Sequence, residues 1–287
     1  MEGNCMATKK AASAKKSKPT AAKKQTTTKV TTVKAAATTT KSSAKTAASS
    51  KGQLMTTALV AEFIGTFVLA AVALSIQGNA FFMGFALVAI VLMIGALSGA
   101  HVNPLITVGA WVTRKISGKR ALGYVVAQAL GAMLALVVMT SYANLAQVDE
   151  QAMMMGGQQA LFTVTPVTGE TESVWYIFFA EMIGAVLFAF AVSAALRMKK
   201  DRTAQALTVG LGLFVALAIA GGAAVFAQAH AIVNPALALS LQAVEFPVHD
   251  IFSIVVYIVA PILGGALGFF LYDLLRGPET SVEEAIE

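Results

Sequence analysis

Long runs of apolar residues, separated by short polar connections, fill most of the chain after residue 53. Six of these runs are long enough for a helix to cross the hydrocarbon core of a bilayer, which takes about 20 residues. They cover residues 54–77, 80–100, 121–142, 174–196, 206–227 and 251–272. The pattern predicts an all-α membrane protein with six transmembrane helices.

Two shorter apolar pieces, residues 103–113 and 234–244, are too short to span a membrane. Each begins with Asn-Pro, and proline suits the first turn of a helix, where its missing N–H costs nothing. The two motifs are Asn103-Pro104-Leu105 and Asn234-Pro235-Ala236. Irregular backbone at membrane depth is tolerated only inside the protein or beside a water-filled cavity. We therefore expect two re-entrant half-helices.

Charged residues divide the connections into two kinds. Connections 114–120 and 197–203 each hold four basic residues, and Arg276 follows the last span, whereas the other charged connections hold only acids. Because Lys and Arg are enriched in cytoplasmic segments, we expect both termini to be cytoplasmic and the protein to lie in the cell membrane. Residues 276–287 form a short acidic C-terminal tail.

The first 53 residues are mainly Ala, Lys, Thr and Ser. Such a segment buries too little apolar surface to offset its chain entropy, so we expect a disordered cytoplasmic tail. It has no specific role, or it is attracted to the headgroups of anionic lipids. Contact with nucleic acid is the least favoured interpretation.

The two halves of the chain repeat each other. The matching segments are Ala61-Glu62-Phe63-Ile64-Gly65 with Ala180-Glu181-Met182-Ile183-Gly184, and Val102-Asn103-Pro104 with Val233-Asn234-Pro235. Residues 54–142 and 174–272 are thus two copies of a three-helix unit. Because three is odd, the copies have opposite orientations, and inverted 3+3 repeats place a site near the bilayer midplane.

In this arrangement the half-helices meet tip to tip, with Asn103 and Asn234 at the tips. Each side-chain amide can donate a hydrogen bond to a solute oxygen. The positive ends of both helices face the membrane centre and disfavour cations and protons. The carbonyls before the tips are expected to form an acceptor track; they belong to Gly99, Ala100, His101, Ile232 and Val233.

Two acids, Glu62 and Glu181, lie inside predicted spans, where a charge is costly. One interpretation is a proton or ion relay. The other is structural: each carboxylate accepts hydrogen bonds from backbone N–H groups of a nearby irregular segment. Their symmetric placement in the two repeats favours the structural interpretation.

These features together resemble the aquaporin, or major intrinsic protein, family over residues 54–275. The resemblance rests on the segment from Ser98 to Pro104, the paired Asn-Pro motifs, the Glu-x-x-Gly repeats, and Gln128 with its counterpart Pro261. It implies an hourglass fold, a homotetramer with one pore per subunit, and passive conduction of water or small uncharged, glycerol-like solutes without a cofactor.

The chain departs from the family pattern at its motifs. Leu105 replaces the usual alanine, and Leu237 stands where most members carry an arginine that lines the outer constriction. By the family's spacing, the other constriction positions are Met83, Gly222 and Ala231, with Ile219 as an alternative to Gly222. We expect an apolar, uncharged constriction and a permissive or unusual pore for neutral solutes, or one that conducts poorly.

Two other functions remain open: a non-conducting structural or membrane-tethering protein, and a proton-coupled transporter that uses Glu62 and Glu181. The sequence shows no phosphate-binding loop, nucleophile triad or metal-spaced set of His and Cys residues. We therefore expect neither an enzyme nor a metal site.

Overall fold

The computed structural model describes residues 40–144, 161–170, 173–198, 200–244, 246–248 and 250–277. The chain divides into two units, Met1–Ala44 and Lys45–Glu287. Only residues 40–44 of the first unit are described, so the architecture below is that of the second. Residues 1–39 and 278–287, which make up most of the two expected tails, lie outside the described residues.

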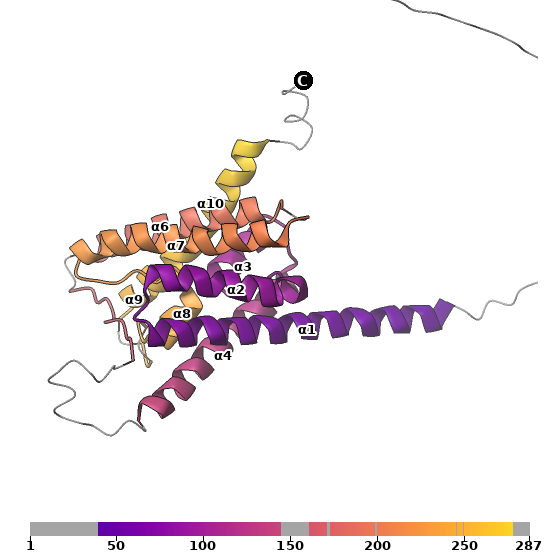
Figure 1. Ribbon diagram of the computed structural model, residues 1–287, viewed down its shortest axis with the longest axis horizontal. Coiled ribbons are helices and arrows are strands. Elements are labelled where there is room, and N and C mark those ends of the chain that lie inside the picture. Colours follow the sequence, from indigo (N-terminus) through magenta and orange to yellow (C-terminus); the bar gives the residue numbers. More distant parts are fainter. Residues whose placement is uncertain are drawn as a thin grey trace, which may run out of the picture. The chain divides into compact units, whose positions relative to one another are not determined.

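The described chain is helical and contains no strand within those ranges. Its elements are α1 (Thr40–Ser75), α2 (Ala80–Ser98), α3 (Pro104–Val112), α4 (Gly118–Ala143), α6 (Val174–Ala195), α7 (Arg202–Phe226), α8 (Pro235–Ser240), α9 (Phe252–Ile254), the π-helix η1 (Val255–Val259) and α10 (Ala260–Arg276). Figure 1 shows their arrangement.

Within the described ranges, six helical segments are long and apolar enough to cross a membrane. They are Leu54–Ser75 within α1, the helices α2, α4, α6 and α7, and the combined segment Phe252–Arg276. The predicted all-α fold with six spans is therefore confirmed, and α3 and α8 are the two short helices between the spans.

Several helices begin before the apolar run that predicted them. α4 begins at Gly118 and α7 at Arg202 because the side chains of Ser117 and Asp201 accept a backbone N–H bond in the first turn. α1 begins at Thr40, inside the segment expected to be disordered. Ala and Lys favour helix, and lengthening an existing helix requires no new nucleus.

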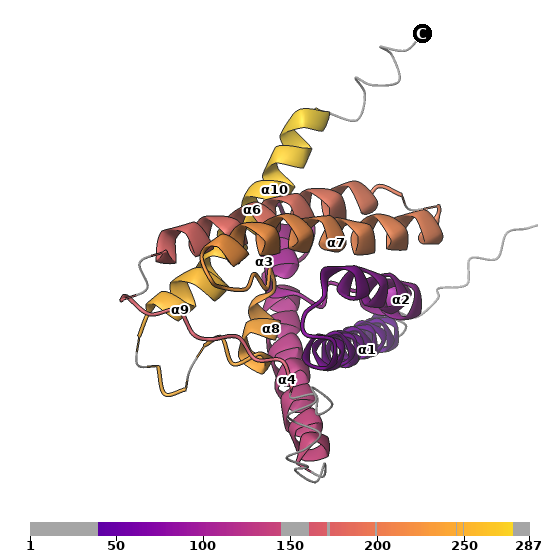
Figure 2. The ribbon, with the colours of Figure 1, turned by 60° about the vertical axis from the view of Figure 1, so that its left-hand side comes forward.

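The spanning helices pack closely where glycine allows it. α1 lies beside α2, and α6 lies beside α7, in both ribbon views (Figures 1 and 2). A Cβ atom on Gly131 of α4 would lie 2.3 Å from the Phe63 carbonyl oxygen of α1. A Cβ on Gly264 of α10 would lie 2.4 Å from the Met182 carbonyl oxygen of α6. Both sites are close helix crossings that need a small residue.

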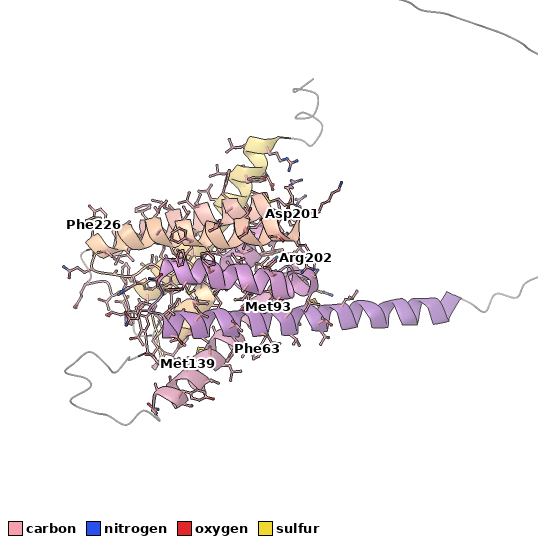
Figure 3. All side chains as sticks on the ribbon, viewed as in Figure 1. Phe63, Met93, Met139, Asp201, Arg202 and Phe226 are labelled. Carbon is pink, nitrogen blue, oxygen red and sulfur yellow. The ribbon has the colours of Figure 1, made fainter. Side chains whose placement is uncertain are left out.

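Large apolar side chains cover the outside of the bundle. Phe82 on α2, Leu122 on α4 and Phe270 on α10 are all more than half exposed. Met93 on α2 and Phe226 at the end of α7 are also exposed (Figure 3). Because an apolar surface of this extent is unfavourable in water, these faces are suited to lipid.

Basic connections of the two repeats meet at one end of the bundle, which we call the basic end. Asp273 of α10 forms ion pairs with Lys115, which follows α3, and with Arg197, which follows α6. The Arg197 Nη2 to Asp273 Oδ1 distance is 3.7 Å. We call the opposite end, where α1 ends and α2 begins, the acidic end.

Candidate pore

Each half-helix begins at its Asn-Pro motif and is capped by the asparagine. Asn103 Oδ1 accepts from the Leu105 N–H at 3.0 Å, and Asn234 Oδ1 accepts from the Ala236 N–H at 3.0 Å. Both asparagines have extended backbone with φ near −157°, and Pro104 or Pro235 follows as the first helical residue. α8 ends at Ser240, so the second half-helix is shorter than the apolar run predicted.

The two asparagines also join the two repeats. Asn103 Nδ2 donates to the Val233 carbonyl at 2.8 Å, and Asn234 Nδ2 donates to the Val102 carbonyl at 3.1 Å. The tips of α3 and α8 are therefore in direct contact. A side-chain amide carries two N–H donors, and each of these crossing bonds uses one. The second hydrogen of each amide can serve a solute oxygen.

The segment before each tip has unusual backbone. Gly99, Ala100 and Val102 have φ values of 95°, 49° and 40°, and Val233 has a φ of 53°. For a β-branched residue such as valine, a positive φ is strained and persists only where the surroundings enforce it. Both tips therefore need an external brace.

Glu62 and Glu181 provide that brace. Glu62 Oε1 accepts from the His101 N–H at 2.9 Å, and Oε2 accepts from the Val102 N–H at 2.7 Å. Glu181 accepts from the Ile232 and Val233 N–H groups in the same way. Both acids are fully buried. This geometry supports the structural interpretation of the two acids over a proton relay.

The brace is not the same in both repeats. Gln128 Nε2 donates to Glu62 Oε2 at 2.8 Å and to Thr107 Oγ1 at 2.9 Å. Pro261 occupies the matching position of the second repeat and has no donor to offer Glu181. Glu62 thus accepts one more hydrogen bond than Glu181, and the extra bond comes from Gln128 of α4.

Two buried tyrosines, which the sequence analysis missed, also hold these segments. Tyr124 OH donates to the Ser98 carbonyl at 2.6 Å, and Tyr257 OH donates to the His230 carbonyl at 3.3 Å. Tyr124 lies four residues before Gln128, and Tyr257 lies four before Pro261. This shared spacing was the signal that could have identified them.

A cavity of about 250 Å³ opens at the acidic end. All four expected constriction positions, Met83, Gly222, Ala231 and Leu237, line it, and so does Ile232. Ile219, the alternative to Gly222, is not among the lining residues and is about half exposed on the outside of α7. A Cβ atom on Gly222 would meet nothing within 4 Å, so this glycine leaves the cavity open.

A second, smaller cavity of about 50 Å³ lies towards the basic end. Gly99, Ala100 and His101, three of the expected carbonyl positions, line it. Of the other two expected carbonyl positions, Ile232 lines the larger cavity. The Val233 carbonyl accepts a hydrogen bond from Asn103 Nδ2.

The larger cavity is lined by the start of α2 and the end of α7, and the smaller cavity by the end of α2 and the start of α7. The asparagine pair lies between these two regions. We call the crossed bonds of Asn103 and Asn234 the waist; neither asparagine is among the described lining residues of either cavity.

Neither cavity has a charged side chain among its described lining residues. Within the described part of the chain, no cluster of three or more His, Cys, Asp or Glu residues could hold a metal ion. The larger cavity does have polar side chains that the sequence analysis did not assign to it, those of Gln77 and His230.

Comparisons with known proteins agree with this geometry. The model of the family described as "MIP: Major intrinsic protein" matches residues 56–272. Aquaporin AqpM of Methanothermobacter marburgensis is 26% identical over 260 residues, covering 77% of this chain and 98% of the relative. Aquaporin NIP3-1 of Arabidopsis thaliana is 27% identical over 241 residues, covering 79% of this chain and 70% of the relative.

A solved structure has the same fold. The aquaglyceroporin from Plasmodium falciparum superimposes with a TM-score of 0.58 at 21% identity, over 78% of this chain and 98% of that one. At this identity the likeness concerns the fold alone. Since the family model spans most of the chain, the protein belongs to the major intrinsic protein family.

Proposed function

We propose that the protein is a passive transmembrane channel for water or small uncharged solutes. It is an integral multi-pass membrane protein, and its family consists of channels for water or small solutes, not of enzymes. The observation that carries the proposal is the crossed pair of asparagine bonds between two cavities at opposite ends of the bundle.

Passage through the waist depends on hydrogen bonding. A solute that leaves the larger cavity loses water and regains hydrogen bonds from the free N–H of Asn103 and of Asn234. The positive amino-terminal ends of the half-helices and the two donors disfavour protons and cations, because neither can accept a hydrogen bond there. The channel therefore passes neutral molecules with an oxygen acceptor and excludes ions.

The outer constriction sets which neutral molecules enter. Leu237 contributes an apolar surface in the position of the family's usual arginine, and Gly222 leaves open space. An uncharged opening that lacks the bulk of an arginine side chain leaves room for solutes larger than water. We propose a permissive filter that passes glycerol-like molecules as well as water.

The setting of the channel follows from charge. The basic end is proposed to face the cytoplasm, because Lys and Arg accumulate on that side of a membrane. Both termini then lie in the cytoplasm of a cell-membrane protein, where the lysine-rich tail can approach anionic lipid headgroups. We propose a homotetramer in which each subunit has its own pore.

The test fills the larger cavity and measures flux. Gly222→Phe places a ring in the open space, whereas Ile219→Phe adds the same ring to the lipid-facing side of the same helix. Stopped-flow light scattering on proteoliposomes would follow water and then glycerol gradients. We expect Gly222→Phe to lose most of the flux and Ile219→Phe to keep it.

Two results would contradict the proposal. Wild-type vesicles that are no more permeable than empty ones to any neutral solute would show that the protein does not conduct. Equal flux through wild type and Gly222→Phe would show that the cavity is not on the conduction path.

A further inference from the structure

The cavity at the acidic end offers an entering solute few polar side chains. Most of its lining is alanine, glycine and larger aliphatic or aromatic residues. The polar side chains among the described lining residues are those of Gln77 and His230. A neutral imidazole has one donor and one acceptor, so His230 can exchange hydrogen bonds with a hydroxyl group in either tautomer.

His230 is held in place at both its backbone and its ring. Its carbonyl accepts from Tyr257 OH at 3.3 Å. Its ring meets the Phe162 ring edge to face, with the centroids 5.1 Å apart and the planes at 76°. Phe162 lines the same cavity. The histidine thus lines the cavity from a fixed position, with the Phe162 ring beside it.

Phe162 is itself fixed, although it comes from the connection between α4 and α6. Its N–H donates to the Leu74 carbonyl of α1 at 3.0 Å. Its ring lies against Gly78, where a Cβ atom would be 2.9 Å from the ring. Gly78 also has a φ of 62°, which favours glycine. Segments far apart in sequence therefore build one polar and one apolar wall at the mouth.

A site built in this way discriminates by hydrogen bonding. A solute in the apolar cavity loses its water shell, and each unpaired polar group then carries a desolvation cost. Where a protein group is placed to bond a hydroxyl, an analogue without that hydroxyl is rejected more strongly than its size would explain. The apolar wall at Phe162 accommodates the carbon side of the same solute.

We propose that His230 is the specificity-determining residue of this cavity and that Phe162 positions it. Together they favour neutral solutes with hydroxyl groups along one edge and carbon along the other. This inference rests on the proposed channel function. Position 237 is a leucine instead of the family's usual arginine, and the inference assigns the selection between solutes to His230 instead.

The experiment compares two solutes of similar size in proteoliposomes, glycerol and propane-1,2-diol, which lacks one hydroxyl. His230→Leu keeps bulk but removes the donor and acceptor, whereas His230→Gln keeps both. Phe226→Leu, on a side chain that is 93% exposed at the end of α7, is the matched control. Permeability is counted above empty vesicles for both solutes.

We expect His230→Leu to lower the glycerol-to-diol permeability ratio about tenfold, the factor for one hydrogen bond of ordinary net strength. His230→Gln should retain most of the wild-type ratio, and Phe226→Leu all of it. Phe162→Leu should give an intermediate ratio, because it frees the imidazole ring without removing it.

An unchanged ratio in His230→Leu would overturn the inference, even if both fluxes changed together. A wild type that conducts water but neither polyol would also overturn it and would leave the channel function intact. A wild type that conducts no neutral solute would overturn the proposed function, and this inference with it.

Discussion

Each waist asparagine uses its two side-chain atoms for different tasks. Oδ1 caps its own half-helix, and this bond fixes which way Nδ2 points. Nδ2 therefore reaches a carbonyl of the opposite repeat. An asparagine that served only as a helix cap could be replaced by aspartate at little cost, since both are good caps. At the waist this exchange replaces a donor with an acceptor.

The first prediction uses this difference. Asn103→Asp keeps the cap on Leu105 but sets a carboxylate against the Val233 carbonyl, so the crossing bond becomes a repulsion. The unpaired buried group costs about 1–3 kcal/mol or more. We expect a lower melting temperature in detergent and a large loss of solute flux. Asn79→Asp, at the exposed cap of α2, is the control. Equal behaviour of the two variants would contradict the account.

A second prediction concerns the outer constriction. Leu237 is buried, with 2% of its surface exposed, and it lines the larger cavity. Leu237→Arg adds bulk and a positive charge there, so glycerol flux should fall more than water flux. Stopped-flow measurements of both solutes check this. Unchanged selectivity would show that Leu237 is not at the constriction.

At the scale of elements, two strained tips depend on their neighbours. The acids on α1 and α6 hold the backbone N–H groups, and the tyrosines on α4 and η1 hold carbonyls before them. A tip that lost its acid would have unpaired N–H groups in a strained backbone. The braces therefore keep the donors and carbonyls of the waist aligned.

A third prediction separates this brace from proton transfer. In Glu62→Gln one acceptor oxygen becomes an amide that faces N–H donors of Val102 and Gln128. We expect lower thermal stability and lower passive flux, with no dependence of flux on a pH gradient before or after the change. Solute accumulation driven by a pH gradient in wild type, lost in Glu62→Gln, would instead identify a proton-coupled transporter.

A fourth prediction concerns the acidic end. The Asp250 carboxylate accepts N–H bonds from Phe252 and Gly169, both at 2.8 Å, and these bonds lower its pKa. A lowered pKa in the folded state adds stability above the unfolded-state pKa of about 3.9, and this stability is lost as the pH falls through the folded value. Wild type should therefore be more stable than Asp250→Asn at neutral pH.

The measurement is thermal unfolding in detergent across a pH series. The difference in melting temperature between wild type and Asp250→Asn should shrink below about pH 4. A difference that is constant with pH, or that grows in acid, would contradict the role given to these two bonds.

How far sequence predicted these elements depends on the kind of signal. The spans follow from apolar length, and the waist from Asn-Pro pairs at matching places in two repeats. The position of Phe162 could not be predicted, because the connection between α4 and α6 has no periodic pattern and its contacts come from distant helices. The choice between Gly222 and Ile219 needed the rotation of α7, since the second repeat has a longer spacing from Glu181 to Asn234.

At the scale of the whole molecule, the inverted repeat brings two similar sets of local bonds together at the waist. Each repeat contributes a spanning acid, a tyrosine and a half-helix, and the opposite orientations bring the two tips together between two uncharged cavities. Lipid-facing side chains surround the bundle, and basic connections gather at one end. These features together suit a route for neutral molecules through an otherwise closed helix bundle.

The central claim is that neutral solutes pass the asparagine pair while protons do not. The most direct measurement follows both fluxes in the same proteoliposomes, with light scattering for glycerol and water and an enclosed pH-sensitive dye for protons. We predict solute flux above that of empty vesicles, mostly lost in Gly222→Phe, together with a proton leak equal to that of empty vesicles. Absence of solute flux, or a proton flux that rises with protein content, would contradict the account.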